Sequence, residues 1–560
     1  MKKIRSFIVC AVITILLFMN CRSLVYADQV TDETSKTATS TSVDKEFIQK
    51  VDDLVKKTLR KAKVPGASLA LVRGDEVIYR TYGYEDREMQ EQIGEDTLFE
   101  LGSMSKAFTG LGILLLEQEG KLSIDDPVKE YIPWLSFSYD GDTNLDNDMT
   151  IANLLYHTSG IPFQTIGYIP EGTAEDSLEK TVKMVNGVKL DFYPGEKYQY
   201  ATVNYDILAY IIQSVTGELY ETFMEQEILD KLGLSDTHMY RYDEEVEDRI
   251  AQGYKFQFLR EVASNPPAYR GNTAAGYIVS SIQDMARWMQ IQMGIVEIPE
   301  ELTQLIMKSH QGNTKVVAEG DKFYGSGWLI DMNGDIIKHG GSNPTFSSML
   351  EMQGKDQFGV CILTNIDSNA AEYIADSIIK IYNGESVAKY KADFYKSSDM
   401  FFSIIIIVSI VVILLYAVVL LKALIDIFKK KRIHVKAKDM KLASIFFVIP
   451  LLIFTGLCTY NLPKILFERL PWSAVGVWAS KTVIWGCILV YIAIVVFMLY
   501  ISLTFNFTKD GEKNYMALIP ISVVNGVASA LIIFTINETF NRNLQYSKEL
   551  LLYFIFSIVV

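Results

Sequence analysis

The stretch FELGSMSKAFTG, residues 99–110, decides the fold of this chain. The apolar residues after Lys106 recur at helical spacing as far as Gln118, and Gly120 follows as a stop signal. We therefore predict a buried helix that begins at Ser103. Gly102 lets another backbone approach closely, and the N-terminus of a helix favours a developing negative charge.

Ser103 and Lys106 form a candidate nucleophile and base. A lysine three residues after a serine lies on the same helical face, one turn away. Burial of the helix would remove water from the amine and lower its pKa toward that of a useful base. The string Ser-x-x-Lys occurs five times in the chain, so the string alone decides nothing. A capping serine followed by an exposed lysine explains this window equally well. Of the other four serines, Ser42 lies in a Ser/Thr-rich segment predicted to be a disordered spacer. The remaining three lack a strand or glycine immediately before an apolar helix: Ser177, Ser377 and Ser386.

Working outward from this stretch, helix and strand patterns lie at both ends of a largely helical middle. Such an order predicts an α+β fold in which distant parts of the chain share one antiparallel sheet. Helical periodicity covers 45–62 and 370–382. Apolar strand patterns cover 67–72, 77–82, 327–332, 336–338, 347–352 and 358–364.

Composition limits the possible functions. The 560 residues are 49% hydrophobic, with a formal net charge of −14. The acidic excess is concentrated in residues 28–398, and a strongly acidic domain would be repelled by phosphate backbones. We therefore expect no nucleic-acid partner. Cys361 is the sole cysteine of this globular part, so neither a disulfide nor a cysteine metal site can form there. We expect no metal and no organic cofactor.

The N-terminus has the pattern of an export signal. Basic residues precede a short apolar run, and small residues follow at cleavage spacing, so residues 1–27 are predicted to be a signal peptide. Residues 28–44 are rich in serine and threonine and have no apolar period, which is typical of a disordered spacer. An extracellular globular domain is then expected at 45–384.

The C-terminal part is predicted to lie in a membrane. After a linker at 385–399, residues 400–560 contain charge-free runs long enough to span a bilayer. The loop at 422–441 holds eight Lys or Arg against two Asp, which places it in the cytoplasm and the globular domain outside. Because these runs carry no ionisable residue, we favour anchoring over transport. The predicted spans are about 401–421, 442–460, 482–505 and 516–536, with a partial span at 550–560.

Six runs in this order resemble the serine β-lactamase and penicillin-binding-protein-like hydrolases, in the branch related to class C β-lactamases. They are FELGSMSKAFTG, LEQEGKLSIDDPVKEYIPWL, IANLLYHTSGIP, FYPGEKYQYATVNYDILAYII, TAAGYIVSSIQDMARW and IKHGGSNPTFSSML. The likeness covers about residues 45–383 and is more specific than any single motif. It implies a β-lactamase/transpeptidase-like fold, with a helical lobe against an antiparallel sheet and the active site at their junction.

The resemblance also implies roles for individual residues. Ser103 would be the acylated nucleophile and Lys106 its partner in proton transfer. Tyr200 corresponds to the tyrosine of the second motif. The third motif would be the edge-strand residues His339, Gly340 and Gly341. The backbone N–H groups of Ser103 and Ser342 would then form the oxyanion hole.

Two departures from the family pattern bear on the substrate. The second motif, usually Tyr-x-Asn, ends here in Thr202, which offers no amide; Asn204 could compensate or not. The third motif has His339 where many members have lysine, which reduces the positive charge near neutral pH. We therefore expect a peptidase or esterase rather than a β-lactamase. His157 is interpreted as a structural residue, and His310, in a second His-x-Gly string, as a surface residue.

The resulting hypothesis is a membrane-anchored extracellular serine hydrolase that forms an acyl-enzyme on amide or ester bonds of D-amino-acid peptides or cell-wall-related substrates. Its expected partners are a small-molecule or peptide substrate and the lipid bilayer. Two alternatives stay open. One is a β-lactam-sensing receptor with slow deacylation. The other is a membrane-tethered peptidase that removes an acyl-D-amino-acid cap from an exported prodrug.

Overall fold

A computed structural model describes residues 40–142, 145, 147–434, 453, 456–457, 459–464 and 466–508. The predicted signal peptide and the predicted spans at 516–536 and 550–560 lie outside these residues, as does most of the span at 442–460. Helix α2 spans Ser40–Ala62, so it includes the last residues of the predicted spacer. Serine, threonine and aspartate, which are abundant there, are favoured at helix starts.

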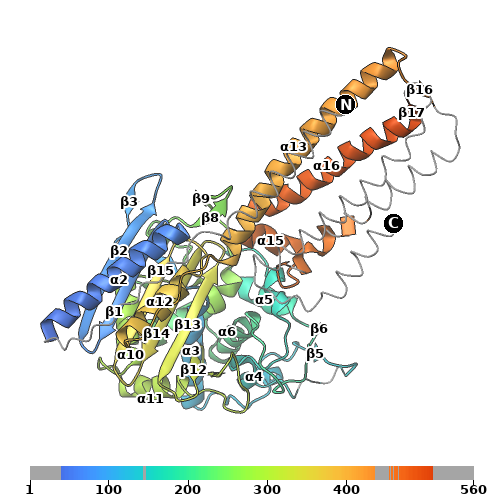
Figure 1. The fold of residues 1–560 in the computed structure, drawn as a ribbon. Coiled ribbons are helices and arrows are strands. Elements are labelled where there is room, and N and C mark those ends of the chain that lie inside the picture. Colours follow the sequence, from blue (N-terminus) through green and yellow to red (C-terminus); the bar gives the residue numbers. More distant parts are fainter. Residues whose placement is uncertain are drawn as a thin grey trace. The chain divides into compact units, whose positions relative to one another are not determined.

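An eight-stranded antiparallel sheet forms the centre of the domain at 45–384 (Figure 1). Its order is β11-β12-β13-β14-β15-β1-β2-β3. Strand β1 pairs with β15, which places Ala67 opposite Thr364 and confirms that the sheet joins distant parts of the chain. The bounds are β1 Gly66–Arg73, β2 Glu76–Asp86, β3 Glu91–Gln92, β11 Lys322–Tyr324, β12 Leu329–Asp331, β13 Ile336–Asn343, β14 Phe346–Gln353 and β15 Phe358–Thr364.

The predicted strands are confirmed, but the prediction for β13 is wrong at its C-terminal end. We expected a strand over 336–338, and β13 continues through the His-Gly-Gly motif to Asn343. Glycines weaken an isolated strand. Here the motif is held in extended form by pairing with β14, in which Gly340 lies opposite Met349 and Gly341 opposite Ser348.

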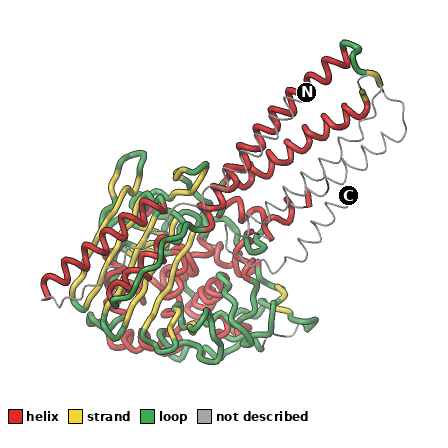
Figure 2. The backbone as a smooth tube through the Cα atoms, viewed as in Figure 1, coloured by secondary structure: helices red, strands yellow, loops and turns green. Residues whose placement is uncertain are grey.

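Helices cover the sheet and build a second lobe beside it. Figure 2 shows the strands gathered in one layer, with helices packed around it. Both α10 and α12 pack on β15, every residue of which is buried. The helices are α3 Ser105–Gln118, α4 Ile151–Leu155, α5 Ser177–Met184, α6 Val203–Thr216, α7 Tyr220–Met224, α8 Asp230–Leu232, α9 Glu244–Glu247, α10 Ile282–Gln292, α11 Glu300–Ser309 and α12 Ala370–Tyr382.

Short elements connect the lobes. Single turns of 3₁₀ or π-helix are η1 Gly102–Met104, η2 Val128–Glu130, η3 Phe163–Tyr168, η4 Glu225–Leu229, η5 Arg270–Asn272 and η6 Thr273–Tyr277. Small sheets pair β4 Phe99–Glu100 and β7 Thr237–His238 with β10 Val279–Ser280, β5 Phe137–Ser138 with β6 Val188–Lys189, and β8 Tyr254–Gln257 with β9 Arg260–Ala263. Strand β4 leads directly into η1, so this small sheet fixes the backbone just before Ser103.

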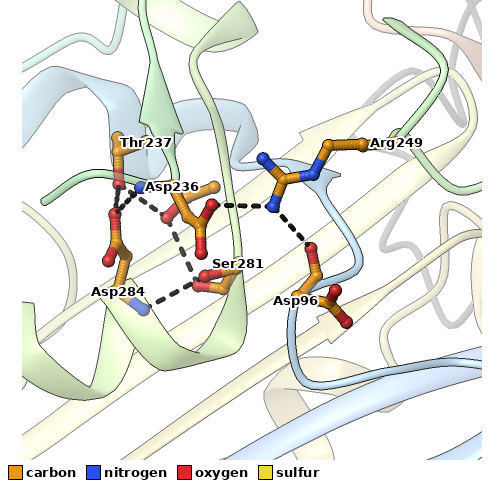
Figure 3. A network of polar contacts seen from close by, with 7 residues as sticks. Asp96, Asp236, Thr237, Arg249, Ser281 and Asp284 are labelled. Carbon is orange, nitrogen blue, oxygen red and sulfur yellow. Dashed lines mark hydrogen bonds and ion pairs between the residues drawn. The ribbon is translucent and has the colours of Figure 1, made fainter. Parts of the chain in front are cut away.

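A buried carboxyl joins the β4-β10-β7 sheet to α10 (Figure 3). Asp284 accepts hydrogen bonds from the Asp236 amide at 2.7 Å and from the Thr237 hydroxyl at 2.8 Å. Its own amide donates to Ser281, the N-cap residue of α10. Arg249 closes the network by donating to Asp236 at 2.7 Å. The network holds β7 against the start of α10.

Two described helices are long and apolar enough to cross a membrane. They are α13, Phe394–Phe428, and the segment Lys481–Thr504 of α16, which spans Lys481–Asn506. The two helices pack along each other, and they cover the predicted spans at 401–421 and 482–505. They support an association of the chain with a membrane. The remaining described elements of this part are α15 Trp472–Trp478 and the strand pair β16 Ile433–His434 and β17 Phe507–Thr508.

Candidate active site

Two glycines bring the start of the central helix against the sheet. Gly102 has a positive φ of 55°, and a Cβ atom there would lie 2.5 Å from the backbone nitrogen of Ser342. A Cβ atom on Gly341 would overlap the carbonyl oxygen of Leu101. No residue larger than glycine fits at either position without moving the strand. This close backbone contact places Ser103, in η1, beside the third motif on β13.

Lys106 lies within hydrogen-bond reach of Ser103. Its Nζ atom is 3.1 Å from Ser103 Oγ and donates to the carbonyl oxygen of Ala275 in η6 at 2.5 Å. The lysine is fully buried, whereas Ser103 is partly exposed. Burial lowers the pKa of Lys106 to about 7, against the opposing effect of Asp206. A large fraction of the amine is therefore neutral near pH 7 and can accept the Ser103 proton.

Tyr200 lies just before α6 with its ring close to the same amine. Lys106 Nζ is 5.0 Å from the centre of the ring. Burial raises the pKa of Tyr200, and Ser103 near its hydroxyl lowers that pKa slightly. Among the described residues, the buried hydroxyl has no hydrogen-bond partner of good geometry. Tyr200 is thus a neutral phenol that can pass on a proton, while Lys106 is the group able to accept one.

The His157 ring packs against the Tyr200 ring, in agreement with the interpretation of His157 as a structural residue. The two rings are 4.3 Å apart. His157 Nδ1 accepts from the Ala201 amide at 3.3 Å and lies 3.0 Å from Nδ2 of Asn204. Burial and the nearby Lys106 lower the pKa of His157 well below its usual value, so the ring is neutral. It holds the loop that carries Tyr200.

His339 is buried and carries no charge at neutral pH. Its Nε2 accepts from the Tyr324 hydroxyl at 3.0 Å, and its Nδ1 lies 2.6 Å from the Gly340 carbonyl oxygen. Burial, followed by the effect of Lys106, lowers the pKa of His339 to about 3. Both ring nitrogens are engaged, so in this arrangement His339 neither accepts a proton nor attracts a substrate carboxylate by charge. Its contribution is to orient Tyr324 and the strand.

The amide that the second motif lacks is not supplied by Asn204. Thr202 is buried at the start of α6. Asn204 is also buried, and its side chain contacts His157 and accepts from the Ser159 hydroxyl at 2.9 Å. The Asn204 side chain is therefore committed to the fold. Ser342 is exposed at the strand edge, where its hydroxyl donates to Asp367 at 2.8 Å.

Sequence reasoning missed one acidic residue of the site and misplaced another residue. Burial raises the pKa of the acidic residue, Asp206, well above its usual value, and Lys106 opposes that shift. Asp206 is fully buried one turn after Thr202 on α6, and Asn272, with its amide nitrogen turned toward Asp206, donates to both carboxylate oxygens at 2.9 and 3.1 Å. An acid within an apolar helix is the signal that could have revealed it. His310 is not a surface residue. His310 is the C-cap residue of α11 and is half-buried there. Its ring packs against the Trp328 ring and forms a hydrogen bond with Gln292 at 2.7 Å.

The antiparallel sheet, the helical lobe and the Ser-x-x-Lys sequence at their junction define a β-lactamase/transpeptidase fold. The Beta-lactamase family model matches residues 51–381. The chain belongs to this family.

Among its relatives is Protein flp of Staphylococcus aureus strain MRSA252, which is 30% identical over 328 residues. That match covers 58% of this chain and 64% of the relative, which is less than two thirds of the relative's length. A penicillin-binding protein homologue from Pyrococcus abyssi has a similar structure, with a TM-score of 0.53 and 25% identity over 63% of this chain and 80% of that chain. A class C β-lactamase shares the fold at a TM-score of 0.52 and 20% identity, over 63% of this chain and the whole of that one.

Proposed function

We propose that this protein is a membrane-anchored extracellular serine hydrolase that cleaves amide or ester bonds through an acyl-enzyme. The observation that carries the proposal is the 3.1 Å separation of Ser103 Oγ from the buried Lys106 amine, whose pKa is lowered to about 7. A nucleophilic hydroxyl beside a neutral base is the requirement for serine acylation. The Beta-lactamase family assignment is consistent with this chemistry.

The proposed reaction has two steps. The Ser103 hydroxyl transfers its proton to Lys106 as Oγ forms a bond to the substrate carbonyl carbon, and the backbone N–H groups of Ser103 and Ser342 stabilise the oxyanion. The carbonyl–leaving-group bond then breaks, and the leaving amine or alcohol takes a proton through Tyr200 and Lys106. Water hydrolyses the acyl-Ser103 ester in the second step and restores the hydroxyl.

The acylation step is tested by labelling the detergent-solubilised full chain with a fluorophosphonate or a labelled penicillin. We expect the adduct on a peptide that contains Ser103, and we expect Ser103→Ala to lower labelling by ~10⁴-fold or more. Ser105→Ala is the matched control, because that hydroxyl lies two residues away and bonds to the Ile278 amide. Unchanged labelling of the Ser103→Ala variant would remove the assignment.

We further propose peptides or esters, rather than β-lactams, as substrates. Thr202 offers no amide at the second motif, and the neutral His339 provides no positive charge for a β-lactam carboxylate. The substrate class that we favour is D-amino-acid peptides related to the cell wall. An acyl-D-amino-acid cap on an exported prodrug is a more specialised substrate of the same class. A panel of D- and L-amino-acid amides and esters separates these possibilities. Hydrolysis of penicillins faster than any member of the panel would contradict this choice.

The second candidate is a β-lactam-sensing receptor. It requires that a β-lactam acylates Ser103 and that deacylation is slow, which would give a long-lived adduct. Deacylation distinguishes the two functions. Release of a labelled penicillin within seconds to minutes supports a hydrolase, and release over hours supports a receptor.

The proposed topology rests on α13, on α16 and on the basic segment at 422–441. Positive charge is retained on the cytoplasmic side, so the hydrolase domain lies outside. A protease added to intact cells should remove the hydrolase domain and leave a membrane-embedded fragment. Protection of the hydrolase domain in intact cells would reverse the topology.

A further inference from the structure

Asp399 ties a hairpin of the hydrolase domain to the point where α13 becomes apolar. It is almost fully buried, and its carboxylate accepts from the backbone amides of Phe258 at 3.1 Å and Leu259 at 2.7 Å. Asp399 precedes by two residues the charge-free run that starts at Phe401. An α-helix rises about 1.5 Å per residue, so Asp399, which binds the hairpin turn, lies about 3 Å along the helix axis before the apolar run begins.

The β8–β9 turn exposes apolar side chains close to the start of the apolar run of α13. Phe258 and Leu259 are the central residues between β8 and β9, with φ values of 51° and 64°, and their side chains are 51% and 47% exposed. Positive φ is uncommon for such residues, and the two bonds from Asp399 hold the turn in this conformation. Val262 on β9 is also exposed. A fixed turn therefore presents two large apolar side chains to its surroundings.

Lysines surround the same turn, although the hydrolase domain is strongly acidic. Lys63 Nζ donates to the Leu259 carbonyl oxygen at 2.5 Å. Lys396, in the first turn of α13, donates to the Lys61 carbonyl oxygen and lies 5.9 Å from the Phe256 ring. Burial lowers the pKa of Lys396, and the nearby charges of Lys63 and Lys61 lower it further. Two acids lie among these lysines: Asp393 acts on Lys396, and Glu261 pairs with Lys63 at 3.7 Å and with Arg87 at 2.8 Å.

We propose that the β8–β9 turn and the lysines Lys61, Lys63 and Lys396 form a docking surface for the anionic lipid headgroups of the leaflet that α13 enters. Apolar side chains at a bilayer surface flanked by lysines bind the interface through both apolar burial and attraction to anionic lipids. This surface rests on the proposed membrane anchoring. It would keep the hydrolase domain held against the membrane instead of swinging on a flexible linker.

The experiment places a nitroxide at Phe258→Cys in the full-length protein, reconstituted in vesicles of phosphatidylglycerol and phosphatidylcholine. The parent protein with its native cysteines gives the background. Met332→Cys is the matched control, because Met332 is an exposed apolar residue in the β12–β13 turn. The accessibility of each probe to oxygen and to a water-soluble nickel complex is then measured. Flotation of the vesicles tests the anchoring separately.

We expect the oxygen-to-nickel accessibility ratio at position 258 to exceed that at position 332 by at least about threefold. It should fall toward the control value in pure phosphatidylcholine and in the Lys63→Gln/Lys396→Gln variant. Equal ratios at the two positions, in vesicles that float with the protein, would overturn the docking surface while leaving the anchor intact. A ratio at position 258 that stays equally high in pure phosphatidylcholine would also overturn it, since a second copy of the chain or neutral lipid, and not anionic headgroups, would then cover the turn.

Discussion

Two buried polar clusters among the described residues, one around Lys106 and one around Asp399, differ in how completely their groups are hydrogen-bonded. Asp399 accepts four hydrogen bonds: the two from the β8–β9 turn, and those from the hydroxyls of Ser480 at 2.7 Å and Thr482 at 2.9 Å. Around Lys106, by contrast, the Tyr200 hydroxyl and His157 Nε2 have no partner among the described residues.

The difference separates a structural cluster from a chemical one. A buried group that is fully hydrogen-bonded stabilises the fold and has nothing left to offer a ligand. An unpaired buried donor costs free energy and is retained where a substrate or a transition state can use it. We therefore expect substitutions at the Lys106 cluster to change reaction rates, and substitutions at Asp399 to change stability.

The largest effect after loss of the nucleophile itself is expected from Lys106→Ala. Removing the base should slow acylation of Ser103 by at least ~100-fold, because the hydroxyl then loses its proton acceptor. Stopped-flow labelling with the fluorophosphonate measures this rate. Thermal unfolding should stay close to that of the wild type, because the cost of burying the Lys106 amine offsets the loss of its hydrogen bonds. A near-normal rate would show that the lysine is structural.

The next effect is expected from Asp399→Asn. The substitution keeps the size of the side chain but replaces one accepting carboxylate oxygen with an NH₂ donor. That NH₂ would face another donor, either the Leu259 amide or one of the two hydroxyls. We expect a loss of about 2 kcal/mol in the free energy of unfolding, with an acylation rate within about twofold of the wild type. Denaturant titration in mild detergent measures the stability. Asp376→Asn, at an exposed ion pair with Lys380, is the matched control and should change stability by less than ~0.5 kcal/mol.

The smallest effect is expected from Asp206→Asn, and it concerns pH. Acylation should increase as pH rises through about 7, where Lys106 loses its proton. Asp206 raises the pKa of Lys106, so removal of its charge should move this increase to lower pH. The plateau rate should fall by about tenfold because the amine becomes a weaker base. The pH dependence of fluorophosphonate labelling measures both changes.

Two controls distinguish this charge effect from a packing defect. Asp206→Glu keeps the carboxyl group and should keep the wild-type pH dependence. Asp284→Asn alters another buried carboxyl whose pKa is raised by burial, in the network of Figure 3, and it should leave the pH dependence unchanged. A pH profile that is identical in Asp206→Asn and the wild type would contradict the electrostatic role of Asp206.

Much of the fold could be predicted from local patterns. Strand β15 and helix α12 match their predicted bounds, because Phe358–Thr364 is a continuous apolar run and Ala370–Tyr382 has a clear helical period. The end of β13 could not be predicted, because Gly340 and Gly341 carry no strand preference of their own. They are extended because β14 pairs with them on one side and η1 packs against them.

The candidate site likewise has some properties that follow from local sequence and others that follow from tertiary contacts. The sequence by itself determined that Ser103 and Lys106 are about one helical turn apart and that an apolar helix follows them, since both follow from spacing and composition. Only the tertiary structure decided that Ala275 and Asp206 face the Lys106 amine, that His339 is neutral, and that Asn204 is committed to His157. Those properties depend on contacts between residues far apart in the chain, and such contacts set the burial and charge around each group.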